Sequence, residues 1–185
     1  MRDGIRHTTV LAGWLLAAGM AGCSAQPVQI AGAESALPAD DGSPGYLDRI
    51  SSQPEVSEND ALRGMLMLLD GDDKAKTFQA RVEALGGRGI VSRTWRHDAD
   101  RALTKGRLAY MVCRACEIRG GVIMLLTGPS QRYCLRELQY MDMMSPGTPA
   151  ATVTGMEFVA VISRADTYRR TGEIPAIMEV TSGGL

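Results

Sequence analysis

The sequence predicts an all-α fold for most of this 185-residue chain, because it contains a weak internal repeat. Residues 103–115 align without a gap on residues 153–165, at an offset of 50, and residues 56–68 form a weaker third copy. In every copy a Ser or Thr follows a Val or Leu and opens a run with the apolar spacing of one helix face. A repeat of this kind predicts a bundle of helix-loop-helix units.

Each copy opens with an expected helix N-cap, a residue whose hydroxyl can accept a hydrogen bond from an amide of the first turn. These residues are Ser57, Thr104 and Thr154. The capping-box position three residues later holds Asp60, Arg107 and Glu157. The expected apolar faces consist of Leu62, Met65 and Leu69 in the first copy, Leu108, Met111, Val112 and Ala115 in the second, and Phe158, Val161, Ile162 and Ala165 in the third.

Two of these helices are preceded by further helical segments. Residues 75–91 have helical spacing that Gly86 and Gly87 interrupt, and Pro146 follows the second segment, residues 129–144. Because Gly and Pro disfavour continuation of a helix, we expect each segment to end there. The Gly-rich stretch lacks the Lys-Ser/Thr of a phosphate-binding loop, so we interpret it as a helix stop.

The first 22 residues are expected to be a bacterial lipoprotein signal peptide. Their apolar stretch, residues 8–19, is too short to span a bilayer and fits the apolar region of a secretory signal. The Met-Ala-Gly before Cys23 resembles the lipobox of bacterial lipoproteins. That resemblance implies cleavage before Cys23, its acylation and attachment to membrane lipid. Ser24 favours the outer membrane, and the alternative is an ordinary signal peptide with a chance cysteine.

Residues 23–45 are expected to be a lipidated, disordered and flexible tether, because a composition rich in Ala, Gly, Ser and Pro buries too little apolar area to fold. Residues 46–175 then form the helical domain, and residues 176–185 form a C-terminal tail. No second apolar run reaches the length of a membrane span, so we expect a soluble body beyond the anchor.

The formal charge is close to neutral, with 20 Lys and Arg against 21 Asp and Glu, but its distribution is uneven. Residues 34–73 carry ten acidic and two basic side chains, whereas residues 81–119 carry nine basic and four acidic ones. Such an asymmetry produces a field that favours an anionic partner on one face, although the two segments could equally complement each other within one fold. Nothing in this balance indicates a nucleic-acid partner.

Residues 84–115, ALGGRGIVSRTWRHDADRALTKGRLAYMVCRA, combine three features. A helix ends in a Leu-x-x-x-Gly-Ile turn, a loop with an aromatic residue and Asp follows, and a Thr opens a helix that ends in Arg-Ala. This arrangement resembles a repeat of the S-layer homology (SLH) domain, with residues 137–165 as a degenerate second copy and residues 56–70 as the closing helix of a third. The resemblance implies a three-pronged helical body that binds cell-wall polysaccharide, with the Arg after each Thr contacting anionic sugar groups.

The position after the Thr or Ser departs from the pattern of that family. It holds Glu58, Lys105 and Gly155, so only Lys105 keeps a positive group, and the loop around Trp95 is longer than the usual form. Cationic and aromatic side chains occur together in the basic half of the domain. The expected contacts with an anionic glycan or an envelope protein are therefore Trp95, Arg96, Lys105 and Arg107. Each of these residues could instead be structural.

Cys113 and Cys116 form a Cys-x-x-Cys pair, a pattern also found in redox and metal sites. The pair lies far from the N-terminus of its helix and outside any strand-helix-strand pattern, which favours packed thiols. Tetrahedral zinc bound with His97 and Cys134 would need spacings typical of no familiar motif. A haem attachment would need His, not Glu, directly after the pair. A thiol or metal protein built on Cys113, Cys116 and Cys134 remains the alternative function, and Cys134 could form a disulfide with either partner if the helices adjoin.

The sequence predicts a protein that is not an enzyme. His97 is the one candidate base outside the signal peptide, and its charged and aromatic neighbours are typical of a solvated loop rather than a catalytic one. We therefore expect a membrane-anchored lipoprotein of the cell envelope, without cofactor or metal. Its expected role is to tether or bind peptidoglycan, another anionic cell-wall glycan or an envelope protein.

Overall fold

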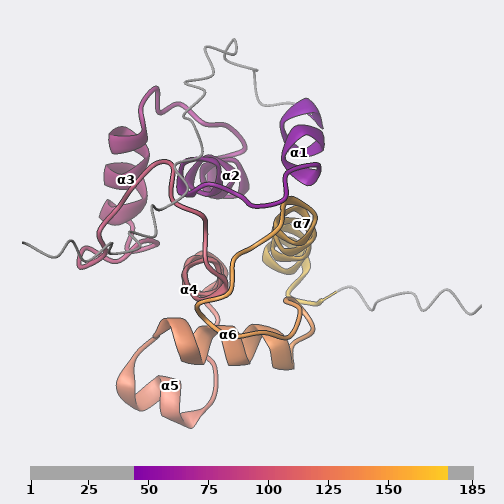
Figure 1. The fold of residues 1–185 in the computed structure, drawn as a ribbon. Coiled ribbons are helices and arrows are strands. Elements are labelled where there is room, and N and C mark those ends of the chain that lie inside the picture. The colour runs from indigo at the N-terminus through magenta and orange to yellow at the C-terminus, as the bar shows by residue number, and fades with distance from the viewer. Residues whose placement is uncertain (1–43, 175–185) are drawn as a thin grey trace, which may run out of the picture. The chain divides into compact units, whose positions relative to one another are not determined.

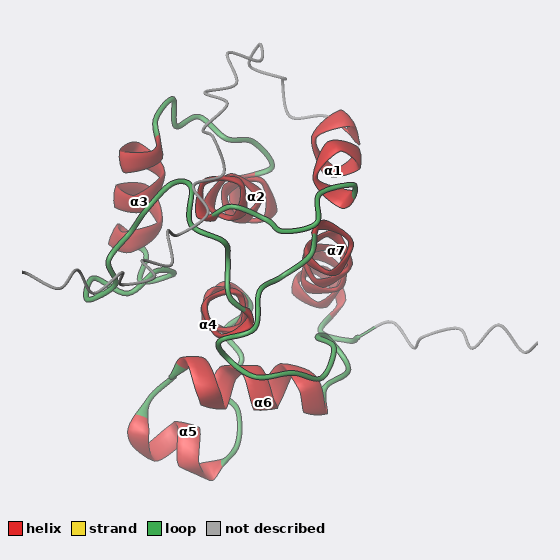
Figure 2. Ribbon diagram, in the orientation of Figure 1, coloured by secondary structure: helices red, strands yellow, loops and turns green. Residues whose placement is uncertain are grey.

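A computed structural model of the chain describes residues 44–174 and confirms the all-α fold. Within this range no residue belongs to a β-strand, and the extended connections form only two isolated bridges (Figure 2). The helices are α1 (Pro44–Ser51), α2 (Glu58–Asp70), α3 (Phe78–Gly87), α4 (Lys105–Ala115), α5 (Val122–Thr127), α6 (Gln131–Tyr140) and α7 (Gly155–Thr171). The expected signal peptide, Cys23 and the expected C-terminal tail lie outside the described residues.

The three copies of the sequence repeat correspond to α2, α4 and α7, and all three N-caps form as expected. Each cap residue has an extended backbone and accepts a hydrogen bond from the amide three residues later. The bonds run from Asp60 N to Ser57 Oγ (3.1 Å), from Arg107 N to Thr104 Oγ1 (3.4 Å) and from Glu157 N to Thr154 Oγ1 (3.3 Å).

The residues immediately before the three caps are joined in a closed ring of backbone hydrogen bonds. The amide of Leu103 donates to the carbonyl of Val56 at 2.7 Å, Val56 donates to Val153 at 3.0 Å, and Val153 donates to Leu103 at 3.0 Å. All three side chains are buried. Because both backbone groups of each residue are satisfied within the ring, three distant parts of the chain are fixed at one point.

The backbone amides in the first turns of the repeat helices find hydrogen-bond acceptors in the same cyclic order. Amides at a helix N-terminus have no partner inside their own helix. Here the amide after each cap donates to a carbonyl in the loop of the next copy. The bonds are Glu58 N to Arg101 O (2.8 Å), Lys105 N to Ala151 O (2.8 Å) and Gly155 N to Gln53 O (3.0 Å). The sequence repeat is therefore also a repeat of backbone contacts.

Three further helices pack on this frame (Figure 1): α6 contacts α4, α3 contacts α2, and α1 contacts α7. The apolar faces expected for the repeat helices are buried, except that Leu69 is half-buried. Gly64 brings α2 close to α7, since a Cβ at this position would lie 2.6 Å from the ring of Phe158. The resulting core holds the three caps at fixed positions.

Two helices were not predicted, and two are shorter than expected. α1 and α5 are short, and α1 begins at Pro44, ahead of the expected domain boundary. In the segment 75–91, α3 begins only after the cap Thr77 and ends at Gly87, at the expected glycine stop. In the segment 129–144, α6 begins after the cap Ser130 and ends at Tyr140, before the expected end. None of the helices between residues 44 and 174 is long and apolar enough to cross a bilayer.

Candidate functional site

Two ion pairs occupy the places where the residue after a cap meets the next copy. At the first place, the Glu58 junction, Glu58 of α2 pairs with Arg107 of α4. At the second, the Lys105 junction, the ammonium of Lys105 lies 2.8 Å from a carboxylate oxygen of Glu157 in α7. Only 4% of Glu58 and 7% of Lys105 is exposed. Charged side chains are rarely buried to this extent without a partner, so each pair is part of the contact between two copies.

Donor and cationic groups surround the carboxylate of Glu58. The amide of Asp98 donates to Oε2 at 3.2 Å, and Nδ1 of His97 lies 3.9 Å from the same oxygen. A guanidinium nitrogen of Arg101 lies 3.8 Å from Oε1. Burial lowers the pKa of Arg107, although an arginine remains charged at neutral pH because its ordinary pKa is so high. The carboxylate is therefore compensated from several sides.

Trp95 packs against this junction. The guanidinium of Arg107 lies over the Trp95 ring, 5.1 Å from its centroid, and Tyr110 meets the same ring edge-on at a centroid distance of 5.1 Å. Arg107 also donates to the carbonyl of Arg96 at 3.1 Å. The cavity left between these side chains has a volume of about 10 Å³, near the lower limit for one water molecule. The Glu58 junction therefore has no room for a sugar.

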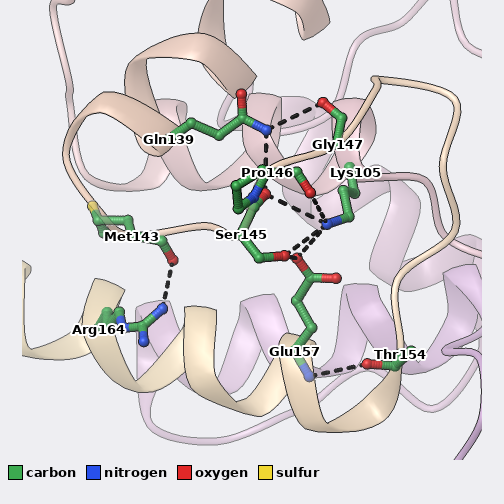
Figure 3. A network of polar contacts seen from close by, with 9 residues as sticks. All are labelled: Lys105, Gln139, Met143, Ser145, Pro146, Gly147, Thr154, Glu157 and Arg164. Atoms are coloured by element: carbon green, nitrogen blue, oxygen red, sulfur yellow. Dashed lines mark hydrogen bonds and ion pairs between the residues drawn. The ribbon is translucent and has the colours of Figure 1, made fainter. Parts of the chain in front are cut away.

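The Lys105 junction is equally occupied (Figure 3). Besides Glu157, the ammonium donates to Oγ of Ser145 at 2.7 Å and to the carbonyl of Pro146 at 3.1 Å. The hydroxyl of Ser145 is itself hydrogen-bonded to Glu157. Gln139 of α6 fixes this loop by donating to two of its carbonyls, each at 3.2 Å. All three N–H donors of the Lys105 ammonium are thus used inside the domain.

The third junction carries no ion pair. Gly155 follows the cap of α7, and a Cβ built there would lie 1.7 Å from the carbonyl oxygen of Ile50 in α1. Only glycine allows this close approach of two backbones. Tyr46 ties α1 to α2, because its hydroxyl donates to the carbonyl of Asp60 at 2.5 Å, and burial raises the pKa of that hydroxyl. The backbone of α1 therefore fills the place that a charged pair fills elsewhere.

The four predicted contact residues separate into two groups. Lys105 and Arg107 are engaged inside the domain, and Trp95 is half-buried against Arg107. The side chain of Arg96 is exposed and forms no ion pair with another described residue. The structure thus brings Trp95, Arg96 and Arg107 together, and it places Lys105 at a different junction.

A shallow basin that the sequence did not predict lies near the Glu58 junction, and we call it the basic basin. Its volume is about 440 Å³. Nε of Arg114 donates to the carbonyl of Gly89 at 2.9 Å, and a Cβ on Gly89 would lie 2.8 Å from the same guanidinium. A glycine in the left-handed region, with φ of 69°, therefore lets the Arg114 side chain lie against the turn. The basin is lined by the turn after α3 and by Ser92, Arg93, Tyr110 and Arg114.

The basic basin keeps two arginines without an acidic partner among the described residues. A third arginine, Arg88, forms a bidentate pair with Asp70 at 2.7 and 2.8 Å, and this hydrogen bonding holds the pKa of Asp70 below its ordinary value. Arg93 and Arg114 have no such partner, and both are exposed. The excess of basic residues in this half of the chain indicated a positive surface, but it could not say which arginines are already paired.

The three cysteines of the helical domain are free thiols in the structure. Cys113 and Cys134 are buried where α4 packs on α6, and Sγ of Cys113 donates to the carbonyl of Cys134 at 3.8 Å. Hydrogen bonding with Cys134, together with burial, raises the pKa of Cys113, and burial raises the pKa of Cys116 to about 11. Hydrogen bonding with Cys113 lowers the pKa of Cys134. Thiols with raised pKa values are poor nucleophiles, which supports the packed-thiol interpretation for Cys113 and Cys116.

The four side chains considered for zinc are not brought together. Within the range that the structure describes, no cluster of three or more His, Cys, Asp or Glu side chains could hold a metal ion. His97 instead lies beside Glu58, at the first junction. The metal form of the alternative function therefore has no geometric support, because zinc needs about four ligands converging on one point.

The fold and its junctions define a class of all-α domain in which three capped helices meet in a closed backbone ring. Comparison of the chain with models of protein families, with curated proteins and with solved structures finds no significant match. The function must therefore be inferred from the residues of this chain.

Proposed function

We propose that this chain is a non-enzymatic lipoprotein of the bacterial cell envelope whose helical domain binds an anionic glycan of the cell wall. Acylated Cys23 would hold the protein in the outer membrane, and the segment that follows would act as a tether. The observation that carries the proposal is the basic basin, where Arg93 and Arg114 have no acidic partner in the described range. The SLH-like pattern of the sequence gives independent support to a glycan partner.

The basin suits an anionic saccharide for physical reasons. A guanidinium presents several N–H donors in a plane and forms strong, charge-assisted hydrogen bonds with carboxylates. Tyr110 adds an aromatic side chain to the lining, and the hydroxyl of Ser92 adds a neutral donor and acceptor. The basin is open, so an extended polymer could cross it without entering the core.

The contact differs from the one that the SLH resemblance implies. That family uses the residue after the Thr, but Lys105 is held by Glu157 and Ser145, and Glu58 is held by Arg107. A glycan that displaced these partners would leave buried charges unpaired, which costs several kcal/mol. The proposed contact therefore involves Arg93 and Arg114, with exposed Arg96 as the remaining member of the residues first expected.

Tethering would strengthen a weak glycan contact. A linker of the length of residues 23–43 has a root-mean-square reach of about 25 Å if it behaves as a flexible chain. A binding module held within such a reach of its partner experiences an effective concentration on the order of mM. Modest affinity of the basin would then be enough to hold the cell wall near the membrane.

The proposal is tested by sedimentation of the purified full chain, in mild detergent, with isolated peptidoglycan sacculi at low salt. We expect the unaltered protein to sediment with the sacculi, and we expect the double variant Arg93→Gln/Arg114→Gln to lose at least about tenfold in affinity. Arg132→Gln/Arg136→Gln removes the same charge from another exposed surface and is the matched control. It should sediment like the unaltered protein.

Two results would count against this function. Equal sedimentation of both double variants would show that the basin is not the contact. If no form of the protein sedimented with sacculi, glycan binding would be rejected and an envelope protein would be left as the expected partner. The anchor is tested separately with Cys23→Ser, which should abolish metabolic labelling by a fatty acid. Labelling that continued in this variant would contradict acylation at Cys23.

A further inference from the structure

Large apolar side chains are exposed on α5 and at the end of α6. Leu125 is 73% exposed and Leu126 is 80% exposed, while Met124, next to them in α5, is only 6% exposed. Tyr140, the last residue of α6, is 87% exposed. A single exposed Leu needs no explanation, but adjacent exposed leucines with an exposed Tyr indicate a surface that meets something apolar.

Three arginines accompany these apolar side chains, while Glu117 and Glu137 border the stretch that holds them and Asp142 follows Tyr140. Between residues 118 and 136 the sequence contains Arg119, Arg132 and Arg136 but no Asp or Glu. All three arginines are exposed, and none forms an ion pair with a residue in the range 44–174. The stretch from residue 118 to residue 136 is therefore both apolar and positively charged.

The arginines of α6 and Tyr140 share one side of that helix. Arg132, Arg136 and Tyr140 follow one another at intervals of four residues, which places them in one stripe. Leu135 and Leu138, on the other side of α6, are buried where the helix packs on α4. The stripe consequently faces away from α4, and in Figure 1 α5 is drawn on that same side of α6.

We propose that Leu125, Leu126 and Tyr140, with Arg119, Arg132 and Arg136, form a tip patch that binds the surface of an anionic lipid bilayer. The leucines enter the boundary between headgroups and acyl chains, Tyr140 lies at the level of the headgroups, and the arginines contact lipid phosphates. α5 has only six residues, so the contact is superficial and does not span the bilayer.

A lipid surface fits these residues better than a protein groove does. The exposed apolar groups are few and flanked by three cations, which matches the chemistry of an interface between acyl chains and phosphate. Such a patch binds reversibly by itself and becomes effective beside another membrane anchor, as one acyl chain with a basic patch does. The tip patch does not depend on glycan binding, so it goes beyond the proposed function.

The test measures contact with acyl chains directly, using the full chain reconstituted in vesicles of phosphatidylethanolamine and phosphatidylglycerol. A tryptophan is introduced by Leu126→Trp and, as the matched control, by Met156→Trp, because Met156 is 70% exposed on α7. Fluorescence is compared between ordinary vesicles and vesicles whose lipids carry bromine in the upper acyl chain. The native Trp95 contributes equally to both variants, and the parent protein gives its background.

We expect bromine to quench the added fluorescence of Leu126→Trp and to leave that of Met156→Trp unchanged. Adding Arg132→Gln/Arg136→Gln to Leu126→Trp should reduce the quenching, and so should replacing phosphatidylglycerol by phosphatidylcholine. Adding Arg93→Gln/Arg114→Gln should not reduce it, which separates the tip patch from the glycan site. Absence of quenching at Leu126→Trp, or equal quenching at both positions, would overturn the proposal. A blue-shifted emission of Leu126→Trp without quenching would indicate contact between two copies of the chain and would also overturn it.

Discussion

The Glu58 junction and the Lys105 junction have equivalent backbone contacts and opposite charges. In both, the amide after the cap donates to the loop of the next copy at 2.8 Å, and the buried side chain after the cap pairs with the capping-box side chain of the next repeat helix. The acid belongs to the earlier copy in one junction and to the later copy in the other. The backbone therefore determines where an ion pair lies, but it does not determine which of the two positions carries the acid. Coulomb attraction is the same whichever partner is the acid.

The largest effect is expected at the Glu58 junction, where the after-cap side chain is the more buried of the two. Glu58→Ala leaves Arg107 beside Trp95 without its carboxylate. We expect the free energy of unfolding to fall by about 3–5 kcal/mol, the usual cost of removing one partner of a buried pair. Urea unfolding followed by circular dichroism measures it. Glu55→Ala is the control, because Glu55 is exposed, and its effect should stay within about 0.5 kcal/mol.

Exchanging the charges of the first ion pair tests directly whether either position can carry the acid. Glu58→Lys combined with Arg107→Glu gives the Glu58 junction the arrangement found at the Lys105 junction. We expect the double variant to be more stable than either single variant, because the reversed pair still attracts. A double variant as unstable as the sum of the singles would show that surrounding groups such as His97 and Arg101 require the acid at position 58.

The uncharged junction should respond to size instead of charge. Gly155→Ala forces a methyl group into the carbonyl oxygen of Ile50, and we expect a loss of about 3 kcal/mol, at the upper end for overpacking. Because the clash is with α1, limited proteolysis should cut near α1 faster than in the unaltered protein. Gly87→Ala is the matched control, since a Cβ at Gly87 meets nothing within 4 Å. An unchanged proteolytic pattern would contradict the close approach of α1 to α7.

A smaller loss is expected at the Lys105 junction. In Lys105→Met the carboxylate of Glu157 keeps the hydroxyl of Ser145 as a donor, and 14% of its side chain is exposed. We therefore expect a loss of about 1–3 kcal/mol in the free energy of unfolding. Lys76→Met, at an exposed position, controls for the loss of a positive charge. A loss as large as that of Glu58→Ala would mean that depth of burial does not distinguish the two junctions.

The smallest effect belongs to the surface pair of Asp70 and Arg88, whose side chains are 37% and 46% exposed. Hydrogen bonding to Arg88 lowers the pKa of Asp70 in the folded state, so the pair stabilises the fold above the ordinary pKa of 3.8 and loses this effect as pH falls through the lowered value. We expect Asp70→Asn to cost at most about 1 kcal/mol at neutral pH, because solvent screens the pair. The difference should shrink towards zero in acid, and urea unfolding at several pH values measures it.

The frame of the domain could be predicted from the sequence because its determinants are local. Ser57, Thr104 and Thr154 each bond an amide three residues away, and the apolar spacing that follows is a property of one helix. α1 and α5 were missed because each is short, and their positions depend on packing against other parts of the fold.

The burial and pairing of Lys105 could not be predicted from local sequence, because its partner Glu157 lies in another copy. A usable pattern was nevertheless present. When consecutive copies are placed in register, the residue after one cap and the capping-box residue of the next copy have opposite charges, Glu58 with Arg107 and Lys105 with Glu157. Arg93 and Arg114 occupy neither of these positions, and only the structure shows that they line one basin.

The ring formed by Val56, Leu103 and Val153 affects how the chain can fold. Each member donates to one partner and accepts from the other, so a nascent chain that ends before Val153 leaves an amide on Val56 and a carbonyl on Leu103 without partners. Contacts between such distant residues also form slowly, because long loops must close first. We therefore expect the domain to fold in one late, cooperative step, after the whole polypeptide has been synthesised.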